Sequence, residues 1–300
     1  MNKRCGYVAI LGAPNAGKST LLNALVGSTV SIVTPKPQTT RSRLHGIINA
    51  GDSQIIFIDT PGIFEAKPKF EKAMVSAAWS GADDAEVLLL VVDANRGLDD
   101  DTRRIIEALK TRKKQVVLVL NKVDKAEKPT LPMLAKELYD LLDFERSFMI
   151  SAKRGDGVKD ILSYLASQMP EGEWLYPEDE PTDATERSLA AEITREQCFL
   201  KLHAELPYSL MVETEKWEEK QIKGVRTLRI NQIIFVERKS QKKIILGEGG
   251  QMLKAIGSNA RHKIGEALDA TVHLFLFIKV KEDWKNDPSV YKAAGLEYKE

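Results

Sequence analysis

The sequence predicts an α/β domain built on a mostly parallel sheet, followed by a smaller α+β domain. Up to about residue 170, short apolar runs alternate with segments of helical periodicity, which favours a parallel sheet covered on both faces. Residues 171–182 are acidic and rich in proline, and this indicates a linker. Beyond the linker the expected order is helix, strand, strand, helix, helix, strand. A chain of 300 residues also exceeds one ordinary core. We therefore expect domains at residues 1–170 and 183–284, and a C-terminal extension at 285–300.

Charge and cysteine content narrow the class of protein. The formal net charge is only +1, but acidic residues crowd residues 171–196 and basic residues crowd 220–263, which mildly favours a nucleic-acid partner. Cys5 and Cys198 are far apart and have no companions at metal-binding spacing, so we expect neither a disulfide nor a zinc site. The N-terminus shows no signal peptide, and the longest apolar run, Val87–Val92, is too short to span a membrane. These features predict a cytoplasmic protein.

The elements of the first domain follow from its apolar patterning. Near-continuous apolar runs predict buried strands, and apolar residues spaced three or four apart predict helices. The expected strands are Tyr7–Leu11, Gln54–Asp59, Val87–Asp93, Val116–Asn121 and Ser147–Ser151, and the expected helices are Thr20–Val26, Phe70–Gly81, Thr102–Arg112, Thr130–Asp143 and Val158–Gln168. Ligands of such sheets bind beyond the carboxyl ends of the strands.

The first strand-to-helix junction, residues 12–19, carries the phosphate-loop pattern GxxxxGK[ST]. Glycines let the backbone wrap around a phosphate, and the helix N-terminus adds partial positive charge. Lys18 is expected to reach the β- and γ-phosphates as a catalytic cation, and Ser19 to bind Mg²⁺. The other loop positions expected to contact the nucleotide are Gly12, Asn15, Ala16, Gly17 and Thr20. The pattern identifies an α/β P-loop NTPase.

Polar residues follow three later strands. Asp59 can hold Mg²⁺ through water, and the Gly62 N–H can meet the γ-phosphate, a catalytic contact. The Asp124 carboxylate can accept both N1–H and the N2 amine of guanine, which adenine cannot offer. The remaining residues of this expected pocket are Asn121, which braces the loops, Lys122, whose stem lies over the base, and Ser151, Ala152 and Lys153, where the Ala152 N–H can donate to guanine O6. The predicted ligand is GTP or GDP.

The second domain carries a candidate RNA-binding loop. Helix 183–206, strands Tyr208–Trp217 and Leu228–Glu237, helices Ser240–Leu246 and Gln251–Leu268, and strand Val272–Lys281 are expected. Residues 247–250 then fit the GXXG loop of a KH module, which clamps single-stranded RNA. Glycines between helices often form only a turn, but basic residues surround this loop. The expected RNA-binding residues are Gly247, Glu248, Gly249, Gly250, Lys242, Lys243, Lys254, Arg261 and Lys263, although the acidic Glu248 should repel phosphate.

On these motifs, residues 1–170 resemble a translation-factor-type GTPase domain, and nearly the whole chain is similar to the Era family of bacterial GTPases. The resemblance implies a type II KH domain after the GTPase domain. It also implies that residues 34–41 form the first switch loop, in which Thr40 coordinates Mg²⁺, senses the γ-phosphate and acts in catalysis. Ile63 stands where Ras-like proteins carry a water-orienting glutamine, so slow intrinsic hydrolysis is implied. Asn15 matches an asparagine that holds K⁺ in some relatives; an ordinary loop role is equally compatible.

The resemblance further implies a function. It describes a GTP-hydrolysing switch that binds the 3′ end of small-subunit ribosomal RNA and assists maturation of the small ribosomal subunit. It also implies a monomer, with any association at the inner membrane face being peripheral. Two alternatives stay open from the residues alone: a constitutive RNA-binding protein with GTP as a structural ligand, and a switch whose basic surface binds acidic lipid or protein.

Overall fold

A computed structural model describes residues 3–41 and 43–298 and divides the chain into two compact units. The first unit comprises Met1–Ser31, Thr40–Asp183 and Tyr291–Glu300, and the second comprises Ile32–Thr39 and Ala184–Val290. The sequence assigned residues 32–39 to the first domain and residues 285–300 to a separate extension, whereas the contacts place 32–39 in the second unit and 291–300 in the first. Each of these segments is therefore placed by its contacts and not by its neighbours in the chain.

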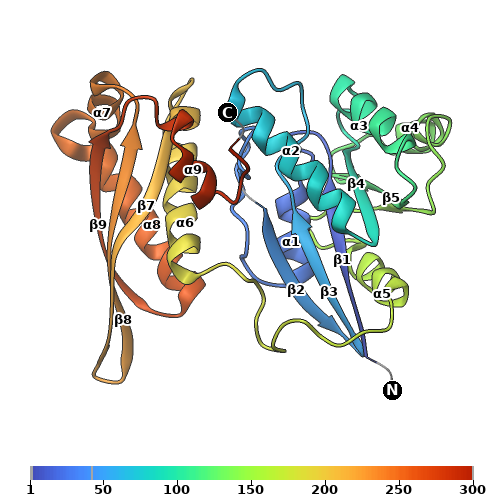
Figure 1. Ribbon diagram of the computed structural model, residues 1–300, viewed down its shortest axis with the longest axis horizontal. Coiled ribbons are helices and arrows are strands. Elements are labelled where there is room, and N and C mark those ends of the chain that lie inside the picture. The colour runs from blue at the N-terminus through green and yellow to red at the C-terminus, as the bar shows by residue number, and fades with distance from the viewer. Residues whose placement is uncertain (1–2, 42, 299–300) are drawn as a thin grey trace. The chain divides into compact units, whose positions relative to one another are not determined.

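The first unit is built on a six-stranded sheet with the order β2-β3-β1-β4-β5-β6, and the first five strands in this order are labelled in Figure 1. All neighbours pair in parallel except β2, which is antiparallel to β3, so the expectation of a mostly parallel sheet is confirmed. The strand β2 was not expected. Its signal is Gly51-Asp52, a hairpin turn between two apolar segments, where Gly51 has φ 61. The strands are β1 (Arg4–Leu11), β2 (Leu44–Ala50), β3 (Ser53–Asp59), β4 (Val87–Asp93), β5 (Gln115–Asn121) and β6 (Arg146–Met149).

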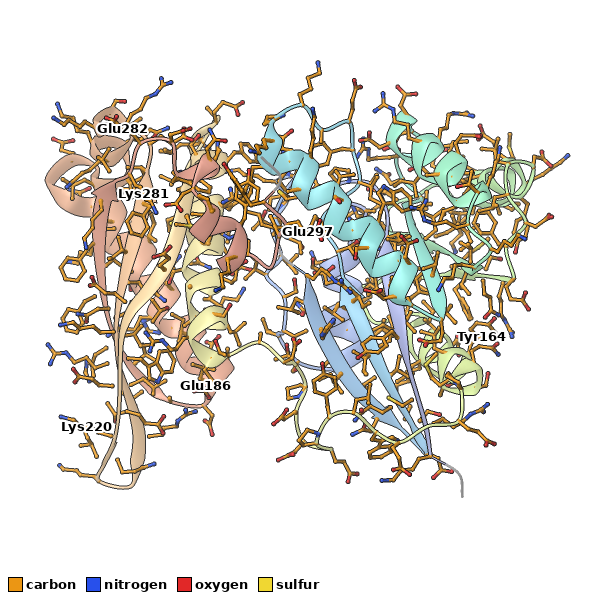
Figure 2. All side chains as sticks on the ribbon, in the orientation of Figure 1. Tyr164, Glu186, Lys220, Lys281, Glu282 and Glu297 are labelled. Atoms are coloured by element: carbon orange, nitrogen blue, oxygen red, sulfur yellow. The ribbon has the colours of Figure 1, made fainter. Side chains whose placement is uncertain are left out.

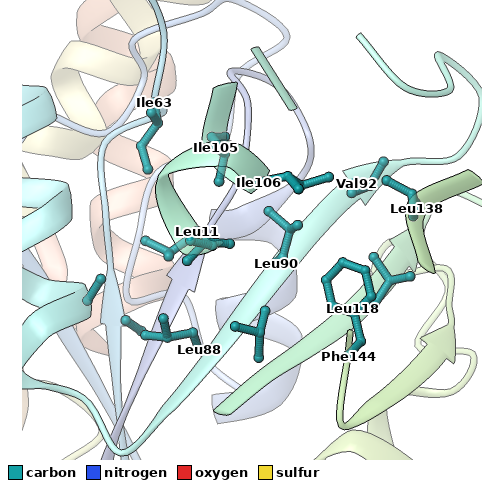
Figure 3. Packing of buried hydrophobic residues seen from close by; sticks show 14 of the residues in the cluster. Leu11, Ile63, Leu88, Leu90, Val92, Ile105, Ile106, Leu118, Leu138 and Phe144 are labelled. Carbon is teal, nitrogen blue, oxygen red and sulfur yellow. The ribbon is translucent and has the colours of Figure 1, made fainter. Parts of the chain in front are cut away.

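Helices cover both faces of this sheet (Figure 1). One face packs against α1 and α5, and the other packs against α2, α3 and α4. The second of these apolar layers includes Leu88, Leu90, Ile105 and Leu118 (Figure 3). Burial on both sides explains why the central strands are apolar at almost every position. The helices are α1 (Lys18–Val26), α2 (Lys69–Asp84), α3 (Asp100–Lys110), α4 (Thr130–Tyr139) and α5 (Val158–Gln168).

The expected linker is fastened to the first unit. Trp174 and Tyr176 pack against Cys5, Ile47 and Ile56, and the Trp174 indole N–H donates to the Asp52 carbonyl at 3.2 Å. These ring contacts give the acidic segment a fixed course along the sheet edge.

The second unit has the expected element order. The antiparallel pair β7 (Leu210–Ile222) and β8 (Val225–Val236) is joined by the parallel strand β9 (Thr271–Val280). The labelled Lys220 lies near the tip of the β7–β8 hairpin (Figure 2). Residues of α6 (Glu186–Lys201) and α8 (Gln251–Leu268) form apolar clusters with the sheet, and α7 (Lys239–Leu246) precedes the glycine loop. The helix α6 is shorter than expected, because it is capped by Thr185 and ends at Leu202.

The C-terminal extension contains two short helical elements. After the short turn η3 (Trp284–Asn286), helix α9 (Pro288–Ala293) carries Tyr291. The Tyr291 ring is fully buried and meets Phe70 of α2 edge-on, with ring centroids 5.4 Å apart. Among the described residues, none of the helices is both long and apolar enough to cross a membrane.

Candidate nucleotide-binding and RNA-binding sites

The phosphate loop lies between β1 and α1, as predicted, and its lysine is held inside it. The Lys18 ammonium donates to the Gly12 and Ala13 carbonyls at 3.0 and 3.1 Å, and the side chain is only 6% exposed. Burial lowers the pKa of Lys18 to about 8. Gly12 is required because its φ is 153 and a Cβ would lie 2.4 Å from the Val91 carbonyl oxygen. The carbonyl groups of the phosphate loop thus enclose the Lys18 ammonium.

Four oxygen-bearing side chains converge beside this loop. The Asp59 Oδ2 accepts hydrogen bonds from Ser19 at 2.8 Å, Ser31 at 2.8 Å and Thr40 at 3.3 Å. Ser19 and Thr40 are also within 2.9 Å of each other. Within the described part of the chain, the fully buried Asp59 Oδ1 has no hydrogen-bond partner. Hard oxygen donors of this kind suit Mg²⁺.

The structure therefore brings together the three predicted metal ligands, Ser19, Thr40 and Asp59. Burial raises the pKa of Asp59, which a bound cation would reverse. Sequence reasoning missed Ser31, and no pattern at that position marks it.

Asn121 at the end of β5 connects two loops of the predicted base pocket. Its Nδ2 donates to the Ala16 carbonyl at 2.9 Å, and its Oδ1 accepts from the Ala152 N–H at 3.0 Å. The N–H that was expected to donate to guanine O6 is thus donated to Asn121 here. Asn121 is 2% exposed, so both bonds are shielded from water. It fastens the phosphate loop to the loop after β6.

Asp124 lies where a guanine-binding carboxylate is expected. A hydrogen bond with Ser151, which is fully buried, holds the Asp124 pKa below its usual range, and Arg154 at 3.7 Å adds to the effect. The carboxylate therefore stays ionised and can accept from two donors at once. The third predicted residue of this loop, Lys153, is exposed.

Lys122 has a partner that sequence reasoning missed. With φ 64, the residue directs its ammonium to the Asn15 carbonyl and to Asp93 Oδ2, each at 2.6 Å. Asp93 ends the strand β4, just as Asp59 and Asn121 end theirs. Its position at a strand end was the signal that could have found it.

Ile63 has no polar role in the structure. Its side chain is 5% exposed and packs in the same apolar cluster as Leu11 and Ile105 (Figure 3). The adjacent Gly62 approaches the phosphate loop so closely that a Cβ would meet Pro14 at 3.1 Å. The turn after β3 is therefore shaped by close backbone approach, and residue 63 supplies no group to orient water.

The glycine loop of the second unit joins α7 to α8. At Gly247, φ is 72 and a Cβ would lie 2.7 Å from the Met252 Cβ, so this position requires glycine. Gly249 and Gly250 also have positive φ, but a Cβ at either would enter open space. The exposed loop and the N-terminal backbone amides of the 18-residue helix α8 form a surface that suits a phosphate.

The basic residues around this loop separate into two groups. Lys242 and Lys243 on α7 and Lys254 and Arg261 on α8 are exposed. Lys254 and Arg261 are about two helical turns apart and share one side of α8. Lys263 is about two and a half turns from Lys254, on the opposite side, where it forms an ion pair with Glu196 of α6. The structure thus does not bring Lys263 together with the other predicted RNA-binding residues.

Comparison with known proteins agrees with this architecture. Residues 7–122 match the family model described as a 50S ribosome-binding GTPase, and residues 205–285 match that of the KH domain. The chain is 52% identical over 295 residues to GTPase Era of Brucella suis, covering 98% of this chain and 94% of that protein. Identity to GTPase Era of Mesorhizobium japonicum is 53% over 293 residues, with 98% and 94% covered.

Two solved structures are similar over nearly the whole chain. Era in complex with MgGDPNP and nucleotides 1506–1542 of 16S ribosomal RNA has a TM-score of 0.91 and 38% identity, covering 98% of this chain and 99% of that one. A variant of Aquifex aeolicus Era bound to GDP and aluminium fluoride has a TM-score of 0.90 and 38% identity, with 97% and 99% covered.

The fold and the site define a P-loop GTPase with a C-terminal KH domain, as the sequence predicted. The two domains are joined in the order and over the length that these relatives share. The chain belongs to the Era family of GTPases.

Proposed function

We propose that GTP binding and hydrolysis control how the KH domain of this chain engages RNA, and that the RNA is the 3′ end of small-subunit ribosomal RNA. The observation that carries the proposal is the similarity to an Era structure with MgGDPNP and 16S ribosomal RNA bound, together with an intact GXXG loop in this chain. We further propose a role in maturation of the small ribosomal subunit.

At the nucleotide site, Asp124 selects guanine and Lys18 binds the β- and γ-phosphates. Ser19, Thr40 and Asp59 would hold Mg²⁺, which supplies charge neutralisation for the phosphates when bound. Gly62 offers its backbone N–H to the γ-phosphate. With Ile63 buried in the core, attacking water must be oriented by other groups, and intrinsic hydrolysis is slow.

At the RNA site, the backbone amides of residues 247–250 meet the RNA phosphates, and Lys242, Lys243, Lys254 and Arg261 extend the positive surface. Glu248 is exposed at the tip of the loop, where its carboxylate repels RNA phosphate. Contact there depends on backbone groups more than on side chains.

We also propose that the protein acts as a cytoplasmic monomer, with any membrane association peripheral, and that K⁺ assists turnover through Asn15. The Asn15 side chain is exposed and its backbone has φ 65. Replacing K⁺ with Na⁺ in the turnover assay tests this role; an unchanged rate leaves Asn15 a plain loop residue.

The main experiment is sequencing of RNA crosslinked to the protein loaded with a non-hydrolysable GTP analogue, compared with the GDP form. Enrichment of the small-subunit 3′ end in the GTP-analogue form alone supports the proposal. Equal crosslinking in both forms, with turnover unaffected by RNA, would instead indicate a constitutive RNA-binding protein. Absence of RNA crosslinks at residues 242–261 would favour the lipid- or protein-binding alternative.

A further inference from the structure

The loop that carries Thr40 is held by the second unit over residues 32–39. The residues that flank this segment, Ser31 and Thr40, both donate hydrogen bonds to Asp59. The segment between them packs in the second unit, where several of its contacts are made by helix α6 and by Leu202, which caps that helix. Thr40 therefore directly follows a segment that is held within the second unit.

The first constraint is apolar. Ile32 is 2% exposed and belongs to the same cluster as Leu189, Ala190 and Ile193 of α6. Burying a side chain of this size contributes about 1.5–3 kcal/mol relative to leaving it exposed. The beginning of the segment is therefore anchored on the helix.

The second constraint is a set of charged side chains that bind backbone groups of residues 32–39 and of the C-terminal end of α6. The Val33 N–H donates to Glu196 Oε1 at 3.1 Å, and the Arg195 guanidinium donates to the Thr39 carbonyl. In the opposite direction, the Lys36 ammonium donates to the carbonyls of Phe199 and Leu202 at the C-terminal end of α6. A cation is favoured there because the last carbonyls carry partial negative charge.

These charges are unusual because two of them are almost fully buried. Glu196 is 1% exposed and Arg195 is 2% exposed. Glu196 is compensated by Lys263 of α8, and Arg195 by Glu192. Buried ion pairs seldom add stability over apolar packing, so their use suggests a specific task. The backbone groups that they bind belong to the segment just before Thr40.

We propose that Arg195, Glu196 and Lys36 are positioning residues for the GTP-bound form. They hold residues 32–39 so that Thr40 stays beside Ser19 and Asp59, and Lys263 keeps Glu196 in place. The inference rests on the proposed role of Thr40 at the Mg²⁺ and γ-phosphate. Because GDP has no γ-phosphate, the clamp should favour GTP over GDP selectively.

The test compares affinities of the full chain, with Mg²⁺, for GDP and for a non-hydrolysable GTP analogue by calorimetry. Glu196→Leu, which removes the acceptor of the Val33 N–H, should lower the preference for the analogue by about tenfold, which corresponds to about 1.4 kcal/mol, and leave the GDP affinity within about twofold. The matched control is Glu215→Leu, which breaks the exposed pair with Lys279 in the same unit and should leave both affinities unchanged.

A second pair of variants guards against a folding defect. Lys36→Met removes the cation from the end of α6 and should reproduce the loss, whereas Lys36→Arg should retain the preference. Equal weakening of both nucleotides would mean that these residues only support the fold, which would overturn the proposal.

Thr40→Ala separates this inference from the proposed function. If Thr40→Ala lowers the preference and the Glu196 and Lys36 variants do not, the clamp is wrong and the site assignment stands. If Thr40→Ala itself has no effect, the proposed role of Thr40 fails and the clamp with it.

Discussion

Replacing Asn121 with alanine should loosen the nucleotide pocket even before any ligand binds. The substitution removes the donor to the Ala16 carbonyl and the acceptor of the Ala152 N–H, both inside the protein. Each buried group left without a partner costs about 1–3 kcal/mol. The loss from both groups should therefore be about 2–6 kcal/mol in the free energy of unfolding of the first unit.

Urea denaturation of the nucleotide-free protein, followed by circular dichroism, measures this loss. Hydrogen exchange of the Ala152 amide adds a local readout, because that N–H loses its acceptor. Asn121→Asp is the informative companion: it keeps an acceptor for Ala152 but cannot donate to Ala16. It should therefore protect the Ala152 amide and still be destabilised.

The control is Asn95→Ala, since Asn95 is an exposed asparagine of the same unit and should change stability by less than about 0.5 kcal/mol. The bracing role assigned to Asn121 is refuted if Asn121→Ala lowers the free energy of unfolding no more than Asn95→Ala does and the Ala152 amide exchanges at the parental rate.

Three other predictions concern charge. The pKa of Lys18 in the folded protein is about 8, below its ordinary value, so between pH 8 and about 10.5 only the unfolded state binds the proton. The free energy of unfolding should therefore rise with pH in this range. If the melting temperatures of the parent and of Lys18→Met change with pH in the same way, this prediction is contradicted. Asp124→Asn should cost guanine nucleotides several kcal/mol of binding and improve xanthine nucleotide binding, so parental GTP affinity by calorimetry would exclude the assigned base pocket. Gly250→Asp should weaken RNA binding severely and leave GTP affinity unaffected, with thermal melting as the check on the fold. Gly250→Asn carries the same backbone strain without the charge and should bind RNA at least tenfold tighter than Gly250→Asp (about 1.4 kcal/mol). If a well-folded Gly250→Asp binds RNA like the parent, residues 247–250 form only a turn.

The amino-acid sequence by itself determined the features that depend on neighbours along the chain. A strand, a glycine loop and a helix follow one another around Lys18, so the phosphate loop was predictable from local pattern. Asp59 and Asn121 end apolar runs, and parallel strands bring their carboxyl ends to one edge of the sheet. The order of elements around residues 247–250 likewise predicted the second domain.

Only the tertiary structure decided the contacts between residues far apart in the chain. Local propensity does not tell that Ser31 reaches Asp59, that Lys122 pairs with Asp93, or that Lys263 pairs with Glu196. It also could not assign residues 32–39 to α6, because that loop has no regular pattern and is held by side chains about 160 residues away. Such placements depend on which buried charges and apolar surfaces find partners, and that is settled when the whole chain packs.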